Sequence, residues 1–299
     1  MQKLAILIPC YNEEKTISNV IKDFLSIITT INNKYESTIY VFNNASTDNS
    51  VALIDEYANS SFQVKRIDVP LKGKGNVVRE MFREIDADVY AMVDGDSTYS
   101  AKDLLKLVKC VENGADMVIG DRLSSTYYTE NKRPFHNFGN KLVKYLINKL
   151  YGTDISDIMT GYRTFSKRFV KCMPVMSEGF QIETEMTIFA LNNHFNIASV
   201  PIDYKDRPVG SSSKLNTYID GAKVLVTIAK AEIFKHPFKY LFIFGLTMFV
   251  YGLFSIQLIS ILGLILIGIG AICGLLAHYL NNLEKLQIKQ IINNTNYEN

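Results

Sequence analysis

The sequence predicts an α/β domain with a doubly wound, mostly parallel sheet, followed by juxtamembrane helices and a transmembrane helical hairpin. Two observations carry this prediction. Short β-branched runs alternate with segments of helical spacing through the first half of the chain, as in sheets whose crossover helices keep the strands parallel. The 44 residues of 240–283 include no Asp, Glu, Lys or Arg, which is enough uncharged chain for two membrane-spanning helices.

Five alternating strands are predicted, at residues 4–8, 38–42, 64–68, 89–93 and 116–120, and a further strand is expected at YRTFS, residues 162–166. Polar clusters follow three of these strands: Pro9–Glu14 follows the first, Asn43–Asp48 the second and Asp94–Thr98 the fourth. In an open parallel sheet, ligands bind beyond the carboxyl ends of the strands. We therefore expect the three clusters to converge on one edge of the sheet.

The third cluster, VDGDST, carries the clearest chemistry. Asp94 and Asp96 flank Gly95 in a turn after a buried strand, a spacing that can aim two carboxylates at one divalent cation. Hard oxygen ligands suit Mg²⁺ or Mn²⁺. A solvated turn is the alternative, because Asp and Gly are also common turn formers.

The segment KGKGNVVRE, from Lys72 to Glu80, interleaves two glycines with two lysines where a helix is expected to begin. Backbone N–H groups at a helix start attract phosphate, and nearby cations strengthen the attraction. A flexible basic loop is the alternative.

Together these motifs resemble, in order and spacing, those of the family 2 inverting glycosyltransferases, which have the GT-A fold. The resemblance rests on IPCYNEE, the polar turn ending in Ser46, Thr47 and Asp48, KGKGNVVR and VDGDST, and it extends from Leu4 to about Lys214. With the hairpin, the chain most resembles the polyprenyl-phosphate glycosyltransferases, a group that includes dolichyl-phosphate mannose synthases. This implies a nucleotide-sugar donor, UDP rather than GDP, an undecaprenyl-like polyprenyl phosphate acceptor, and Mg²⁺ or Mn²⁺ on Asp94 and Asp96.

The resemblance also implies donor-binding roles for Pro9, Tyr11, Glu13, Asn43 and Lys74. Two positions depart from the family pattern. Residues 43–46 read Asn-Asn-Ala-Ser where the family usually has Asp-Asp-Gly-Ser, so base preference is less certain because an amide both donates and accepts. Thr98 stands where dolichyl-type relatives often carry a Gln near the metal.

Three further segments are assigned to the substrates. DIMTGYR resembles the family's Asp-x-x-Ser/Thr-Gly-Phe/Tyr-Arg motif and places Asp157 on the acceptor side, with a helix cap and turn as the alternative. In GFQIETEM we prefer Glu183 to Glu185 as a substrate-binding acid, although acids also suit a helix start. YKDRPVGSSSKL resembles the loop that meets the lipid phosphate, with one extra residue, and implicates Arg207, Ser213 and Lys214; a disordered linker is the alternative.

A phosphate monoester is largely ionised at neutral pH and needs little help from a general base. We therefore expect catalysis by electrostatics and a single inverting displacement. Arg207 and Lys214, with Arg122, Arg133 or Arg163, are expected to hold the attacking phosphate. Asp157 is expected to orient the acceptor or stabilise positive charge on the sugar, so the predicted catalytic residues are Asp96, Asp157 and Arg207.

Charge and composition limit the remaining classes. A net charge of +2, from 32 basic and 30 acidic residues, argues against a nucleic-acid partner, and the four cysteines lack metal or redox spacing. The first apolar run, Leu4–Ile8, is too short for the core of a signal peptide. Lys230, Lys235 and Lys239 precede the hairpin, and Lys285 and Lys289 follow it, which predicts a multi-pass cell-membrane protein with both termini and the catalytic domain in the cytoplasm. A homo-oligomer is left open.

The predicted domains are 1–215 (catalytic), 216–239 (juxtamembrane), 240–283 (two spans) and 284–299 (tail). The spans are predicted at 240–256 and 259–280 with a turn around Gln257, and a buried hairpin or re-entrant loop is the alternative. Asn140–Tyr151 has the pattern of an interfacial amphipathic helix or of one packed on the sheet. The alternative functions are a catalytically weak membrane adaptor, a nucleotidyltransferase and a processive polysaccharide synthase.

Overall fold

The structure is a computed structural model that describes residues 1–124, 134–208, 210–211, 213–254 and 257–297. It divides into two compact units, residues 1–225 and 226–299. The strands are β1 Gln2–Cys10, β2 Tyr35–Asn43, β3 Val64–Asp68, β4 Val89–Met92, β5 Met117–Asp121, β6 Arg163–Ser166 and β7 Ile197–Pro201. The helices are α1 Ile17–Ile28, α2 Ser50–Ser60, α3 Lys74–Glu84, η1 Ala101–Asp103, α4 Leu104–Glu112, α6 Pro134–Tyr151, α7 Lys167–Cys172, α8 Ile182–Asn192, α9 Thr217–Lys235, α10 Pro237–Phe254 and α11 Gln257–Tyr297.

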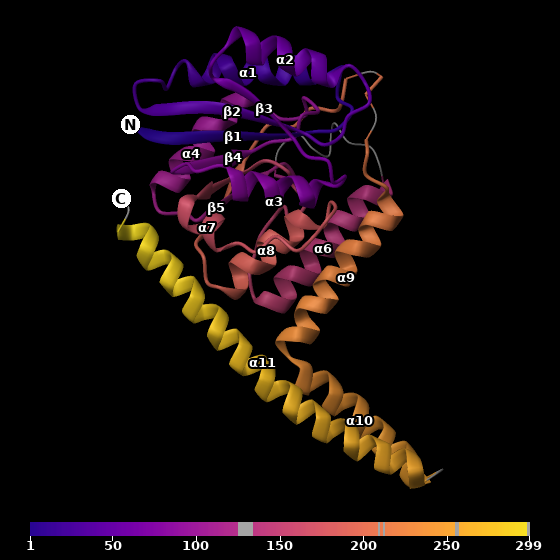
Figure 1. The fold of residues 1–299 in the computed structure, drawn as a ribbon. Helices are drawn as coiled ribbons and strands as arrows, with labels where there is room; N and C mark the ends of the chain where they lie inside the picture. Colours follow the sequence, from indigo (N-terminus) through magenta and orange to yellow (C-terminus); the bar gives the residue numbers. More distant parts are fainter. Residues whose placement is uncertain (125–133, 209, 212, 255–256, 298–299) are drawn as a thin grey trace. The chain divides into compact units, whose positions relative to one another are not determined.

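The first unit is built on one seven-stranded sheet in the order β3-β2-β1-β4-β6-β5-β7 (Figure 1). All neighbouring strands run parallel except β6, which is antiparallel to both β4 and β5. The predicted doubly wound, mostly parallel sheet is therefore confirmed, and each of the five predicted strands is present. The edge strand β7 was not predicted, because its half-exposed residues give no clear apolar run.

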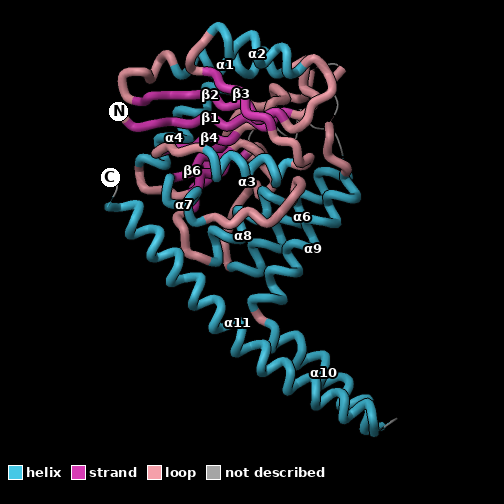
Figure 2. The backbone as a smooth tube through the Cα atoms, viewed as in Figure 1, coloured by secondary structure: helices cyan, strands magenta, loops and turns pink. Residues whose placement is uncertain are grey.

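Both faces of the sheet are covered by helices, and Figure 2 shows the strands enclosed between them. Leu4, Ile6 and Ile8 of β1 belong to one buried cluster with Phe24 of α1 and Leu107 of α4. Side chains alternate along a strand, so the intervening residues of β1 face the opposite side, where α3 packs. Burial on both faces explains why the central strands have almost uninterrupted apolar sequences.

The chain turns sharply after three of the strands. Asn12, Ala45 and Ser97 have φ values of 54°, 54° and 60°, in the left-handed region that is unfavourable for residues with a Cβ. They follow β1, β2 and β4, respectively, at the carboxyl edge of the sheet. Such strain is often concentrated at functional sites, where the surrounding structure maintains it.

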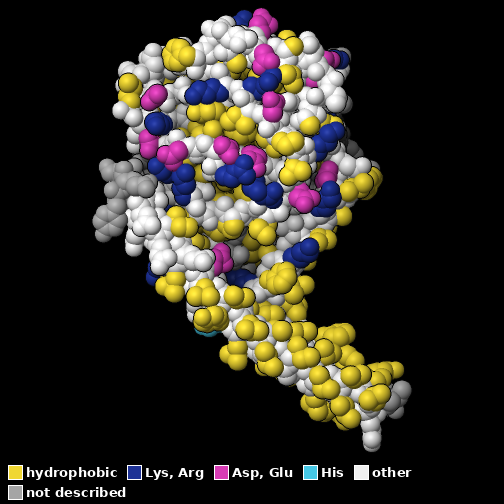
Figure 3. Space-filling model, in the orientation of Figure 1, with side chains coloured by type: hydrophobic (Ala, Val, Ile, Leu, Met, Phe, Trp, Pro, Cys, Tyr) yellow, Lys and Arg dark blue, Asp and Glu magenta, His cyan; other side chains and the backbone are white. Residues whose placement is uncertain are grey.

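The second unit contains a helical hairpin formed by α10 and α11. Gly245 of α10 meets Gly263 of α11 at close backbone approach, and a Cβ on either glycine would collide with the facing helix. Only 11% of the apolar window of α10 and 17% of that of α11 are buried, and Figure 3 shows hydrophobic side chains covering the hairpin surface. Both helices are long and apolar enough to cross a membrane, and the low burial argues against a buried core hairpin.

The helix limits differ from those predicted. The turn expected around Gln257 falls partly at residues 255–256, outside the described residues, and Gln257 itself begins α11. The second helix continues past Leu280 to Tyr297, because the following residues include strong helix formers and neither Gly nor Pro. In α6, Val143 and Ile147 are buried whereas Phe138 and Tyr145 are exposed, so this helix packs on its unit and also presents apolar side chains outward. An interfacial role for α6 stays a prediction.

Candidate active site

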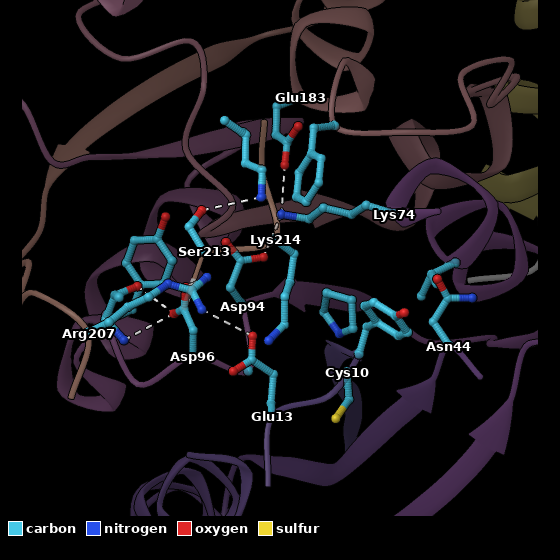
Figure 4. Close-up of a pocket in the computed structure, with 18 of the residues that line it drawn as sticks. Cys10, Glu13, Asn44, Lys74, Asp94, Asp96, Glu183, Arg207, Ser213 and Lys214 are labelled. Atoms are coloured by element: carbon cyan, nitrogen blue, oxygen red, sulfur yellow. Dashed lines mark hydrogen bonds and ion pairs between the residues drawn. The ribbon is translucent and has the colours of Figure 1, made fainter. Parts of the chain in front are cut away.

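A cavity of about 330 Å³ lies at the carboxyl edge of the sheet, within the first unit (Figure 4). The loops after β1, β2 and β4 contribute to its wall, as predicted from the strand-end clusters. Its lining includes these predicted site residues: Pro9, Tyr11, Glu13, Lys74, Asp94, Asp96, Arg122, Glu183, Arg207, Ser213 and Lys214. Asn43, Asp157 and Arg163 do not line it, and Arg133 lies outside the described residues.

Lys74 joins two carboxylates across the cavity wall. Its Nζ lies 2.5 Å from Asp94 Oδ1 and 2.7 Å from Glu183 Oε1, and the Lys74 side chain is 9% exposed. Burial alone would lower the pKa of Lys74, but the charges of Asp94 and Glu183 outweigh it and raise the pKa above its ordinary value. Lys74 is therefore a fixed cation. Glu183, the predicted acid of GFQIETEM, lines the cavity and is linked to Asp94 by its ion pair with Lys74.

Arg207 pairs with the other carboxylates. Its guanidinium lies 2.6 Å from Asp96 Oδ2 and 3.2 Å from Glu13 Oε1. Asp96 Oδ1 also accepts hydrogen bonds from the hydroxyl of Thr98 at 2.6 Å and from its backbone N–H at 3.1 Å. Thr98, one of the two departures from the family pattern, thus holds the Asp96 carboxylate in place.

Burial and nearby charge perturb the acids. Burial raises the pKa of Asp96 most, the negative charge of Asp94 raises it further, and Arg207 opposes both. The pKa of Glu13 is likewise raised by burial, and again Arg207 lowers it. Burial and neighbouring negative charge disfavour the ionised form of such carboxylates, and a bound cation would offset both.

The donor set fits a hard divalent cation. Within the described ranges, no three His, Cys, Asp or Glu side chains are grouped as ligands of one metal. Two carboxylates, Asp94 and Asp96, are nevertheless sufficient for Mg²⁺ or Mn²⁺, which commonly take their other ligands from substrate phosphates and water.

The predicted catalytic Asp157 is fully engaged behind the cavity. Its carboxylate accepts hydrogen bonds from Arg122 Nε at 2.7 Å and Arg122 Nη2 at 3.0 Å, and the residue is 1% exposed. Arg122 in turn lies over the ring of Tyr204, 5.9 Å from its centroid, and lines the cavity. Asp157 therefore reaches the site only through Arg122, whereas buried Arg163 donates to the carbonyls of Ile158 and Thr160 and supports the same loop.

The helix start of α3 is occupied by protein. The N–H groups of Gly75 and Asn76 donate to the carbonyl of Glu178 at 2.9 and 3.3 Å. A Cβ on Gly75 would collide with the Ser177–Glu178 backbone, so this glycine permits the first turn of α3 to pack closely against that loop. These N–H groups do not form the phosphate-binding helix start that the KGKG pattern suggested.

The loop bearing Arg207 is folded against the strand ends. The backbone N–H of Lys205 donates to the carbonyl of Thr98 at 2.9 Å, and Lys15 Nζ donates to the carbonyl of Gly210 at 2.9 Å. Tyr99 and Tyr204 pair edge to face at a centroid distance of 6.1 Å. Both tyrosines line the cavity and were missed in the sequence, where isolated aromatic residues carry no signal for a site.

The comparisons with known proteins agree with this geometry. Residues 5–173 match the family described as glycosyl transferase family 2. Glycosyltransferase AglJ of Haloferax volcanii is 32% identical over 243 residues, which cover 81% of this chain and 75% of that protein. The dolichyl-phosphate hexose transferase of the same organism is 27% identical over 227 residues, covering 76% of this chain and 92% of that protein.

Among solved structures, glucosyl-3-phosphoglycerate synthase of Mycobacterium tuberculosis is similar with a TM-score of 0.60 and 16% identity, covering 77% of this chain and 80% of that one. That structure holds Mn²⁺, uridine diphosphate and glucosyl-3-phosphoglycerate. At this identity the likeness establishes the fold, which is GT-A-like, with an acid-lined cavity at the carboxyl edge of the sheet.

The family match, the GT-A-like fold and the acid-lined cavity together define the class of protein as a sugar transferase. The chain belongs to glycosyl transferase family 2 and is a glycosyltransferase. Its relatives include polyprenyl-phosphate sugar transferases.

Proposed function

We propose that this protein transfers a hexosyl group from a nucleoside diphosphate sugar, UDP rather than GDP, to a membrane-held polyprenyl phosphate with inversion at the anomeric carbon. One observation carries the proposal. The carboxylates of Asp94 and Asp96, which suit a metal–diphosphate, line the same cavity as Arg207 and Lys214. These two cations belong to a loop that is close in sequence to the apolar hairpin. Acids and cations therefore meet where an anionic donor and an anionic acceptor have to react.

Asp94 and Asp96 would hold a divalent cation, which would neutralise charge on the departing nucleoside diphosphate. A phosphate oxygen of the acceptor forms the new bond to the anomeric carbon as the bond from that carbon to the diphosphate breaks. Because the acceptor oxygen is already ionised, no protein group has to remove a proton. This agrees with an Asp157 whose oxygens are engaged by Arg122.

The cations of the site have distinct tasks. Lys74, fixed between Asp94 and Glu183, holds the Asp94 carboxylate in the wall. Arg122, oriented by Asp157, and Arg207 with Lys214 offset the repulsion between donor diphosphate and acceptor phosphate. Ser213 contributes a hydroxyl to the same wall.

For localisation, we propose that α10 and α11 span the cell membrane, with both termini and the catalytic unit in the cytoplasm. The lysines that flank the hairpin support this orientation by the positive-inside rule. The predicted boundaries at 215, 239 and 283 remain proposals for where catalytic, juxtamembrane and spanning segments meet.

The test is a transfer assay with the full-length protein in detergent. Labelled UDP-glucose, UDP-N-acetylglucosamine and GDP-mannose are each incubated with undecaprenyl phosphate and Mn²⁺ or Mg²⁺, and label is measured in the lipid extract. We expect a lipid-linked product from a UDP-sugar, dependent on divalent cation, with an anomeric configuration by NMR opposite to that of the donor. Absence of a lipid product with every donor would contradict the proposal.

A further inference from the structure

The loop between β3 and α3 is held by the side chain of Asn44. Asn44 Nδ2 donates to the carbonyl of Val69 at 3.1 Å and to that of Leu71 at 2.7 Å. Its Oδ1 accepts from the backbone N–H of Gly73 at 2.7 Å. One amide thus ties together three backbone groups of the Val69–Gly73 loop.

Only an amide can make this set of contacts. A carboxamide has two N–H donors and an acceptor, whereas a carboxylate at neutral pH only accepts. Both donors of Asn44 are directed at carbonyl oxygens of the loop, and the residue is 5% exposed. An Asp of the same shape would direct an anionic oxygen at the carbonyls of Val69 and Leu71.

The loop forms one end of the cavity. Lys72 and Gly73 line it beside Pro9, Tyr11 and Asn44. Lys72 Nζ lies 5.3 Å from the ring centroid of Tyr11, so the position of the loop sets the spacing of these two side chains.

The two ends of the cavity differ in charge. Figure 4 shows Asn44 and Cys10 on one side and Arg207 and Asp96 on the other. In the same view Asp96 lies beside Arg207, and Asp94 and Glu13 lie between the two sides. The charged lining residues of the Val69–Gly73 loop and the start of α3 are the cations Lys72 and Lys74. An uncharged, hydrogen-bonding ring fits the first end, and a metal–diphosphate fits the second.

A second amide holds the same loop from outside the cavity. Asn76, in the first turn of α3, donates through Nδ2 to the carbonyl of Lys72 at 3.0 Å. Asn76 does not line the cavity. Its effect on a ligand there has to pass through the loop.

We propose that Asn44 is a positioning residue that sets the Val69–Gly73 loop as the wall of the nucleobase subsite, and that it does not itself recognise the base. The inference rests on the proposed function, because it takes the ligand to be a nucleoside diphosphate sugar. A residue that recognised the base directly would act alone, whereas a residue that positions the loop shares its effect with Asn76.

The test compares Asn44→Asp and Asn76→Asp in full-length protein, with Asn113→Asp, an exposed residue after α4, as the matched control. Binding of UMP without metal, and of UDP with Mn²⁺, is measured by calorimetry, and KM and kcat are measured with the UDP-sugar that the protein uses. We expect Asn44→Asp to weaken UMP binding about 30-fold and Asn76→Asp about fivefold, on the scale of two lost hydrogen bonds and one. KM should rise with kcat nearly unchanged, and Mn²⁺ affinity, which reports the opposite end, should stay as in the unmutated protein.

Each outcome of these measurements either supports or overturns the positioning role of Asn44. Equal UMP binding by Asn44→Asp and the unmutated protein overturns the inference. A loss for Asn44→Asp with none for Asn76→Asp also overturns it, because Asn44 then acts on the base directly. If the Asn44 variant does not fold, Asn76→Asp still decides, by a graded loss or by none. Failure of the unmutated protein to bind UDP or GDP contradicts the proposed function instead.

Discussion

The two units of the chain differ in which side chains they bury: the first buries charged side chains at its cavity, and the second exposes large apolar ones. In residues 1–225 the cavity carboxylates of Glu13, Asp96 and Glu183 are buried, with Asp96 at 6% exposure. In residues 226–299 large apolar side chains are exposed, with Leu275 at 73%. A buried charge is stable only with partners, and Asp96 has Arg207 and Thr98. An exposed apolar surface on this scale marks contact with a membrane or with another protein, and the length and hydropathy of α10 and α11 favour the membrane. The first unit is thus folded for water with a polar site inside it, and the second is suited to lipid.

If the first unit carries the reaction and the second carries membrane attachment, a substitution in the cavity lowers sugar transfer and leaves membrane attachment unchanged. Asp96→Asn is expected to lower transfer about a thousandfold or more, roughly 4 kcal/mol of transition-state stabilisation, because a metal ligand and the partner of Arg207 are lost together. Transfer is measured with labelled donor, and attachment by flotation with liposomes. Asp86→Asn, which changes a surface acid paired with Lys171, is the matched control. Retained transfer by the Asp96 variant in Mn²⁺ would refute the metal role.

Removing the second unit is the converse test. A chain that ends at Lys235 is expected to bind UDP with affinity within about twofold of the full protein, yet to transfer to undecaprenyl phosphate about a hundredfold more slowly, because acceptor and enzyme no longer share one surface. A short-chain, water-soluble polyprenyl phosphate is the control acceptor and should restore most of the rate. Equal use of long and short acceptors by the truncated chain would show that the hairpin does not deliver the lipid.

Arg207 lies on the cavity side, in the loop expected to meet the acceptor. Arg207→Ala is expected to lower transfer about 10- to 100-fold and to raise the KM for lipid phosphate, and Arg207→Lys should restore only part because the planar guanidinium is lost. The comparison variant is Arg83→Ala, which removes a surface arginine paired with Glu84. An unchanged KM for lipid phosphate, with lost donor affinity, would move Arg207 to the donor side.

The same variant has a predicted pH effect. Arg207 lowers the pKa of both Asp96 and Glu13, while burial raises them. Removing the arginine therefore raises both pKa values further, so these acids become protonated at a higher pH than before. Because the site requires ionised Asp96, the acidic limb of the pH–rate profile should move to higher pH in Arg207→Ala. A limb displaced to lower pH would contradict the assigned pairing.

The sequence predicted what depends on local pattern and left out what depends on contacts between distant segments. The parallel strands could be predicted because burial on both faces leaves continuous apolar runs, and the hairpin because lipid excludes charge. The antiparallel direction of β6 carries no such pattern. The pairing of Lys74 with Glu183 joins residues far apart in the chain, and no local spacing announces it.

Site residues show the same limit. Asp94 and Asp96 were found because one turn holds both. The family resemblance selected Asn43 rather than Asn44, and this choice was wrong for the cavity. Asn43 Nδ2 donates to Asp68 Oδ1 at 2.7 Å, and Asn44 is the residue that lines the cavity. Asp157 and Arg122 were both selected, but their pairing, which makes one the support of the other, is visible only in three dimensions.

The smallest predicted effect concerns stability within the first unit. Ala45, in the turn after β2, has a φ of 54°, where its Cβ costs about 1–2 kcal/mol and glycine has no such cost. Glycine also gains freedom in the unfolded chain, which offsets about 0.4–1 kcal/mol. Ala45→Gly should therefore stabilise the protein by roughly 0.5–1 kcal/mol and raise the unfolding midpoint of the first unit by about 1–4 °C.

The matched control for Ala45→Gly removes the same methyl group elsewhere. Ala52 is exposed within α2, so Ala52→Gly should destabilise the same unit by about 0.5–1 kcal/mol. Thermal unfolding followed by circular dichroism should thus give shifts of opposite sign, with liposome flotation unchanged for both variants. Two downward shifts would mean that the turn after β2 holds Ala45 without strain. Opposite signs would show that the unit maintains an unfavourable backbone conformation at the edge of the sheet where its cavity lies.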